Sequence, residues 1–287
     1  MKFIKYDTKE EFLTENLEIL LKEEAKNEIM IGITLEHRNE KIQKWLLGRI
    51  EDNGEIKAIF LVDDDREGLL LYSTENNISE DVIDCLIDNI INLKINLKEI
   101  LTSQENAKKI GEKYSKKIGK EMYIEQNMYI MVFDKIQEIC LLNQNEKIEK
   151  LEKETVNYEE LKTNIKEMYQ DNFRGRECSS EEATKVAEAF LKKGIYVLRN
   201  ENNEIVSQAV TVRKQVNGCA IGGVITFKKH RGHGYAKRLV HMLCNELLKN
   251  NYKYVVLHVN SKNEPAISIY SKIGFKKIDE TAKVKFI

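Results

Sequence analysis

The spacing of apolar residues divides the chain into helix-like and strand-like segments that alternate along its length. Apolar residues recur at the helical period in segments that predict helices at 8–22, 79–93, 104–118, 157–171, 181–193, 233–249 and 264–273. Short apolar or alternating runs predict strands at 3–6, 56–62, 68–73, 121–133, 147–154, 195–200, 204–214, 218–226, 253–259, 275–278 and 282–286. This mixture of elements predicts an α/β fold.

The order of these elements is similar in the two halves of the chain, which predicts two domains of related architecture. The length of 287 residues also suits two domains, since a domain takes about 150 residues. We place the domains at 1–140 and 141–287, with the boundary inside the stretch 139–149. That stretch contains neither Pro nor Gly, so its composition does not mark it as a linker.

Charge and cysteine content narrow the class of protein. Lys and Arg number 46 against 47 Asp and Glu, a net charge of -1, so the chain lacks the positive excess that holds a nucleic-acid backbone. The five cysteines are scattered and form no C-x-x-C pair, a pattern typical of reduced cytosolic thiols. Acids and bases stand where a signal peptide needs an apolar run, and no apolar run is long enough to span a membrane. We therefore predict a cytoplasmic protein without a nucleic-acid or membrane partner, while its oligomeric state stays open.

Metal binding is not predicted. The run Asp63 to Asp65 sits between two predicted strands, where a polar hairpin turn explains it better than a metal site.

The most informative stretch is 224–236, where an apolar strand runs into a basic loop and then directly into a helix. Gly232 and Gly234 flank the helix start, and a helix N-terminus offers unpaired N–H groups with a partial positive charge. Glycines there let a phosphate approach the backbone. The stretch holds no Walker Gly-Lys-Ser/Thr, and its G-x-G-x-x-G is incomplete. Taken alone, it is either a pyrophosphate cradle or a glycine-rich turn that begins a helix.

A second constellation follows the next predicted strand. Asn263 is placed to cap a helix. The first turn of that helix tolerates Pro265, and Gly274 ends it. Tyr270 lies on the same helical face as Ala266.

Together the two stretches resemble the GNAT superfamily of acetyl-CoA-dependent N-acyltransferases, over roughly 147–287. The family's cofactor motif, Arg/Gln-x-x-Gly-x-Gly/Ala, is matched by Arg231, Gly234 and Ala236. Its later motif, Asn-x-x-Ala-x-x-x-Tyr followed by Gly-Phe/Tyr, is matched by Asn263, Ala266, Tyr270, Gly274 and Phe275. The resemblance implies GNAT-like domains, each a mixed, mostly antiparallel central sheet flanked by helices.

The resemblance also implies acetyl-CoA as the cofactor and assigns residues to it. Backbone groups of Val224, Ile225 and Thr226 would pair with the pantetheine arm, and a backbone N–H around Ile225 or Thr226 would polarise the thioester carbonyl. The pyrophosphate would lie on the loop and helix start formed by Gly232, His233, Gly234, Tyr235, Ala236 and Lys237. Arg231 would add charge, as would Lys228 and Lys229 unless they belong to a solvated loop. Asn263 would contact the cofactor arm or serve only as a cap.

Catalysis is expected to be direct attack of an amine on the thioester. The resemblance makes Tyr270 the general acid for the leaving thiolate, the alternative being a core tyrosine. His258 has a suitable ordinary pKa for the base, although simple packing explains it as well. Arg174 and Arg176 either read an acceptor carboxylate or belong to a charged surface loop.

The first half carries no such cofactor motif, so the chain resembles two-domain acetyltransferases with a degenerate N-terminal half and an active C-terminal half. The predicted function is transfer of an acetyl group to a primary amine of a small molecule or peptide. Two alternatives stay open. One is a glycine N-acyltransferase-like enzyme that uses another acyl-CoA, and the other is a non-catalytic acyl-CoA-sensing module.

Overall fold

The structure, a computed structural model, describes residues 1–36, 45–63, 67–138, 142–172 and 177–287. Several expectations therefore lie outside the described residues: Arg174 and Arg176 as acceptor-site residues, Cys140 as a thiol, Asp64 and Asp65 in the turn, and the boundary at 140/141. Within the described parts of the chain, no helix is long and apolar enough to cross a membrane.

The chain forms two compact units, each of which is described by itself. The first unit comprises Met1–Met131, His258–Glu264 and Lys277–Ile287, and the second comprises Val132–Leu257 and Pro265–Lys276. The units are not consecutive halves of the chain, because the C-terminal strand returns to the first unit. Strand β12 (Lys276–Phe286) pairs there with β5 (Glu99–Ser103), with Thr281 opposite Ser103.

The first unit has a mixed sheet. Its strands lie in the order β1 (Lys2–Tyr6), β2 (Leu46–Asp52), β3 (Glu55–Asp63), β4 (Gly68–Ser73), β5, β12 and β6 (Met122–Phe133). The pairs β1–β2, β2–β3, β3–β4 and β5–β12 are antiparallel, and β4–β5 is parallel. Parallel neighbours need a crossover connection, which here is α3 (Glu80–Asn92).

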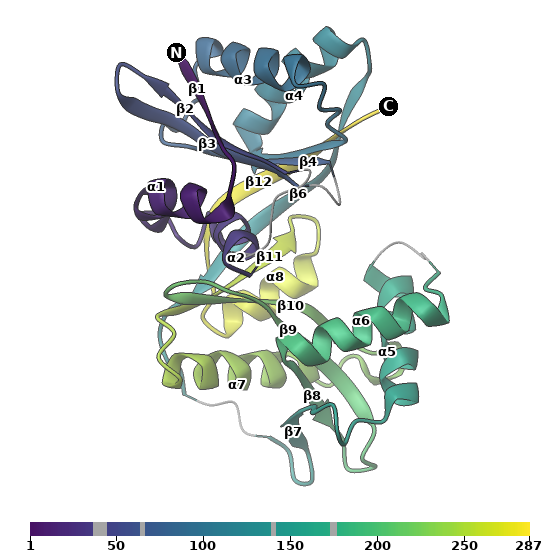
Figure 1. The fold of residues 1–287 in the computed structure, drawn as a ribbon. Helices are drawn as coiled ribbons and strands as arrows, with labels where there is room; N and C mark the ends of the chain where they lie inside the picture. Colours follow the sequence, from purple (N-terminus) through teal and green to yellow (C-terminus); the bar gives the residue numbers. More distant parts are fainter. Residues whose placement is uncertain (37–44, 64–66, 139–141, 173–176) are drawn as a thin grey trace. The chain divides into compact units, whose positions relative to one another are not determined.

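Both faces of this sheet are buried. Side chains that alternate along each strand divide between two cores: Phe60 and Val62 of β3 point to one core, and Ile59 and Leu61 point to the other. Helices α3 and α4 (Gln104–Ile118) cover the first core, and α1 (Lys9–Leu21) and α2 (Glu28–Glu36) cover the second (Figure 1). Near-continuous apolar runs such as 58–62 follow from this double burial.

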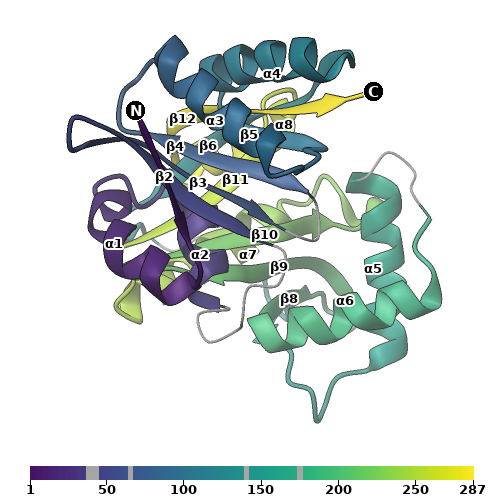
Figure 2. The same ribbon diagram turned by 45° about the horizontal axis from the view of Figure 1, so that its top comes forward.

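The second unit contains a further run of neighbouring strands. Its strands lie in the order β11 (Tyr254–Asn260), β10 (Gly218–Thr226), β9 (Ile205–Lys214), β8 (Ile195–Arg199) and β7 (Lys147–Lys150). Helices α5 (Tyr158–Asn172) and α6 (Ser180–Lys193) lie side by side (Figure 2) and share a core with these strands. Helix α7 (Tyr235–Lys249) packs on β8, β9 and β10 through Leu239, Val240 and Leu243, and α8 spans Glu264–Lys272.

The predicted α/β class, with mixed and mostly antiparallel sheets flanked by helices, is confirmed. Three elements escaped the prediction: α2, β2 and β5. Helix α2 is apolar around most of its circumference, so it lacks the periodic contrast that marks an amphipathic helix. The end of the chain is one strand, β12, where two short strands were expected. Asp279 and Glu280 in its middle are polar enough to imitate a turn.

Candidate active site

Strand β10 leaves its parallel neighbour part-way along its length. Gly218, Cys219 and Ala220 pair with Tyr254–Val256 of β11, and β10 then continues to Thr226 beside β9. Along this second stretch the register with β9 shifts, so that Gly223 and Val224 stand opposite the single residue Ala209. Such a bulge bends the strand and takes residues out of the ladder. Gly223 has a φ of 58°, which a side chain would strain.

The three strand residues that the sequence analysis assigned to the cofactor arm differ in their backbone contacts, because one lies in the bulge and the other two pair with β9. The carbonyl of Ile225 accepts a hydrogen bond from Ser207 Oγ at 2.7 Å, and the carbonyl of Thr226 accepts one from Arg231 Nε at 3.1 Å. Both residues also pair with β9. Val224 is half-buried and lies within the bulge. Of the three, Val224 is therefore best placed to offer backbone groups to a ligand.

The loop after β10 ends in an unusual helix start. A short 3-10 turn (Lys228–His230) leads to Gly232 and Gly234, whose φ angles are 86° and 74°. Gly234 occupies the cap position of α7 without a side-chain cap, and the first turn contains no acidic residue. A Cβ atom built on Gly232 meets nothing within 4 Å. The N–H groups at this helix start and the open space beside Gly232 therefore fit an anion.

Arg231 holds this loop in place. Besides its bond to the Thr226 carbonyl, its guanidinium pairs with Asp171 of α5. The N–H of Lys228 donates to Glu167 Oε1, also on α5, at 2.7 Å. The sequence analysis assigned Arg231 to the cofactor's phosphates. In the structure Arg231 also fixes the loop to α5.

A buried ion pair that the sequence analysis missed supports the same loop from the other side. Arg238, in the first turn of α7, donates to the His233 carbonyl at 2.9 Å and to both carboxylate oxygens of Glu146, at 2.9 Å and 2.6 Å. The exposed fractions of the two side chains are 12% and 5%. A bidentate guanidinium–carboxylate pair fixes geometry as well as charge, so His233 is presented in one arrangement.

We expect Glu146→Gln to destabilise the protein by about 2 kcal/mol, since it leaves a buried guanidinium without its charge partner. Burial alone would raise the pKa of Glu146, but the Asn143 N–H and Arg238 hold it below the ordinary value of 4.5. A carboxyl whose pKa is lower in the folded protein than in the unfolded chain stabilises the fold at any pH above its unfolded-state pKa. This stabilisation is lost as the pH falls through its folded-state pKa. Chemical denaturation should therefore show the difference between wild type and variant shrinking below pH 4.5. A constant difference down to pH 3 contradicts this account.

Tyr270 is in α8 within the second unit and is 8% exposed. Its ring packs on Phe275, with centroids 5.7 Å apart. Among the described residues, its hydroxyl has no hydrogen-bond partner. Burial raises its pKa well above the usual value, and Cys244 adds to the effect. The phenol therefore keeps its proton throughout the neutral range.

His258 and Asn263, two further site residues of the sequence analysis, fall in the first unit and not with Tyr270. His258 Nε2 lies 3.1 Å from Oε1 of the fully buried Glu28. Asn263 directly precedes α8, and its N–H donates to the Asn260 carbonyl at 2.9 Å. The structure thus brings the strand, loop and helix residues 224–237 together in one unit with Tyr270, while the base and arm-contact assignments stay predictions.

Comparison with known proteins connects this site to a family. A family model described as FR47-like protein matches residues 193–284, which include β10, the glycine loop and α8. A tandem GNAT protein from the clavulanic acid biosynthesis pathway has a similar structure over 99% of this chain and 98% of its own, with a TM-score of 0.61 at 10% identity. The chain has the two-domain GNAT fold. The resemblance inferred from the two motifs is thereby confirmed.

Other relatives agree with this fold. The structure of a GCN5-related N-acetyltransferase from Sphaerobacter thermophilus is similar over 88% of this chain and 84% of that protein's chain, with a TM-score of 0.63 and 12% identity. The structure of an acetyltransferase of the GNAT family from Colwellia psychrerythraea is similar over 100% of this chain and 99% of that protein's chain, with a TM-score of 0.58 and 13% identity. A UPF0039 protein from Schizosaccharomyces pombe is 32% identical over 95 residues, which span 33% of this chain and 63% of that relative.

Proposed function

We propose that this protein transfers an acetyl group from acetyl-CoA to a primary amine of a small molecule or peptide. The observation that carries the proposal is the start of α7. There, two glycines of positive φ precede a helix N-terminus that has neither a side-chain cap nor an acidic first turn. A diphosphate needs backbone donors without competing side chains, and this helix start provides them.

Each part of the second unit has a place in this proposal. The N–H groups of Gly232 through Lys237 would hold the pyrophosphate, and the backbone of Val224 in the bulge would hold the pantetheine arm. Bound acetyl-CoA supplies an activated acyl thioester. Tyr270 Oη holds its proton at neutral pH and is our candidate to pass it to the departing sulfur. His258, a residue of the first unit, is our candidate for the base that deprotonates the amine.

Release of free thiol from acyl-CoA in the presence of amines tests the proposal. The experiment combines acyl chains of increasing length with small amines, amino acids and short peptides, and a thiol reagent reports turnover. We expect amine-dependent release to be fastest with acetyl-CoA. Faster release with longer or aromatic acyl chains would favour the glycine N-acyltransferase-like alternative. Binding of coenzyme A without release for any amine would favour the acyl-CoA-sensing module.

A further inference from the structure

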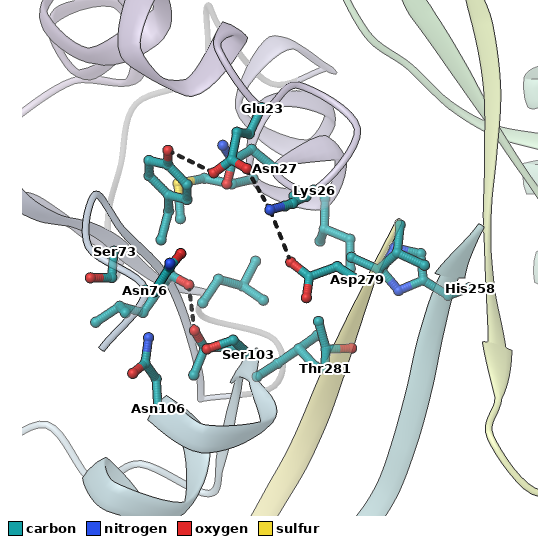
Figure 3. A pocket seen from close by; sticks show the side chains of 18 of the residues that line it. Glu23, Lys26, Asn27, Ser73, Asn76, Ser103, Asn106, His258, Asp279 and Thr281 are labelled. Carbon is teal, nitrogen blue, oxygen red and sulfur yellow. Dashed lines mark hydrogen bonds and ion pairs between the residues drawn. The ribbon is translucent and has the colours of Figure 1, made fainter. Parts of the chain in front are cut away.

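The first unit contains a cavity of about 200 Å³, and all of its lining residues belong to that unit (Figure 3). It lies where β4 and β5 part. These strands pair in parallel from Gly68 to Leu70, and the cavity lining begins at the last pair, Leu70 and Leu101, and continues along Leu71–Ser73 of β4 and Thr102–Ser103 of β5. This is the same strand arrangement that β10 and β11 show in the second unit.

The helix after β4 differs sharply from α7. Ser79 caps α3 and accepts a hydrogen bond from the Val82 N–H at 3.4 Å. Glu80 and Asp81 fill its first turn with negative charge. Carboxylates at a helix N-terminus occupy the place that an anion would take, so a phosphate-bearing ligand is disfavoured here. The cavity of the first unit thus needs a ligand of different chemistry.

Carboxylates dominate the charged lining of this cavity. Tyr72 donates to Glu23 at 3.1 Å, Glu23 pairs with Lys26, and Lys26 Nζ lies 3.5 Å from Asp279 Oδ2, a chain visible in Figure 3. Burial alone would lower the pKa of Lys26, but Glu23 and Asp279 raise it. One ammonium is thus shared by two carboxylates. The third carboxylate of the lining, Glu75, pairs with Lys57 at 2.9 Å.

Two hydroxyl groups beside Asp279 have no hydrogen-bond partner among the residues that the structure describes. Thr281 is 9% exposed, and its Oγ1 is buried without a hydrogen bond, as is Ser103 Oγ. The two residues are directly opposite in the β12–β5 pairing, so their side chains share one face of the sheet. Asp279 precedes Thr281 by two positions in β12 and therefore lies on that face too. Buried polar groups are almost always hydrogen-bonded, so orphan hydroxyls in a cavity wall point to a polar occupant.

We propose that this cavity binds a small protonated amine that also carries hydroxyl groups. The ammonium would add a second positive charge beside Glu23 and Asp279, two carboxylates that Lys26 alone does not neutralise, and a hydroxyl would satisfy Thr281 and Ser103. A volume of about 200 Å³ has room for several water molecules, which suits a compact amino alcohol. All of the lining residues belong to the first unit, so amine binding is measured in the absence of coenzyme A.

The test is calorimetric titration of the full-length protein with 2-amino-1,3-propanediol, in a buffer without amines. Glycerol is the matched control, since it differs only by a hydroxyl in place of the ammonium. We expect saturable binding of the amine and at least about tenfold weaker binding of glycerol, because a charge-assisted hydrogen bond to a carboxylate is lost. Equal binding of the two compounds, or no saturable binding of the amine, overturns the proposal.

Two variants and one control variant locate the site. Asp279→Asn keeps the shape of the side chain and should weaken amine binding by about tenfold. Asp88→Asn removes a carboxylate of α3 that does not line the cavity and should leave binding unchanged. Thr281→Val replaces a buried orphan hydroxyl with a methyl group, so it should weaken binding without lowering the melting temperature. Unchanged amine binding in both Asp279→Asn and Thr281→Val would overturn the assignment of this cavity.

Discussion

Replacement of Tyr270 by Phe should lower kcat for acetyl transfer by about 100-fold, the usual contribution of a general acid. The KM for acetyl-CoA should change little, because the ring that packs on Phe275 is retained. The free energy of unfolding should be almost unaffected, since the lost hydroxyl has no partner among the described residues. Steady-state kinetics by thiol release and chemical denaturation of the same preparations measure both quantities.

The pH profile distinguishes an acid from a packing residue. Because burial raises the pKa of Tyr270 above 10, the wild-type rate should show no loss from phenol ionisation up to pH 10. Tyr252→Phe is the control: it removes another partly buried hydroxyl of the second unit and should keep full activity. An unchanged kcat in Tyr270→Phe at saturating cofactor contradicts the acid assignment.

Replacement of Gly232 by Asp should weaken binding of coenzyme A by about 100-fold or more. The added carboxylate enters the open space beside the start of α7, where the pyrophosphate is proposed to bind, and like charges brought together cost several kcal/mol. The φ of 86° adds a conformational cost of about 1 kcal/mol to the fold, because only glycine adopts this backbone readily.

Gly54 provides the matched control for this variant. It too has a positive φ, 84°, and a Cβ built there meets nothing within 4 Å. Gly54→Asp in the first unit should therefore carry a similar stability cost and leave coenzyme A binding intact. Equal loss of binding in both variants would mean that stability, and not the phosphate position, explains the effect.

The two motifs were readable from the sequence because each is local. The residues of the strand, loop and helix start at 224–237 follow one another directly, so their spacing suits either an anion site or a glycine-rich turn, and the resemblance to the GNAT superfamily implied the anion site. The glycine pair Gly222-Gly223 also carried a signal, since glycine inside a strand marks a bulge. The bulge takes Gly223 and Val224 out of the ladder with β9.

The supports of the site were not predictable because they join distant segments. Arg238 and Glu146 are 92 positions apart, and nothing in either neighbourhood indicates the other. The return of β12 to the first unit likewise depends on the pairing of Thr281 with Ser103, which a pattern of charged residues does not reveal. The cavity of the first unit needs residues from the turn between α1 and α2 through to β12, so only the folded chain shows it.

The central claim is that the start of α7 in the second unit binds acetyl-CoA. Calorimetric titration of the wild-type protein and of Gly232→Asp with coenzyme A tests this most directly. We predict one site per chain in the wild type and a loss of about 100-fold in affinity in the variant. Absence of binding in the wild type, or equal affinity in both proteins, would contradict the account.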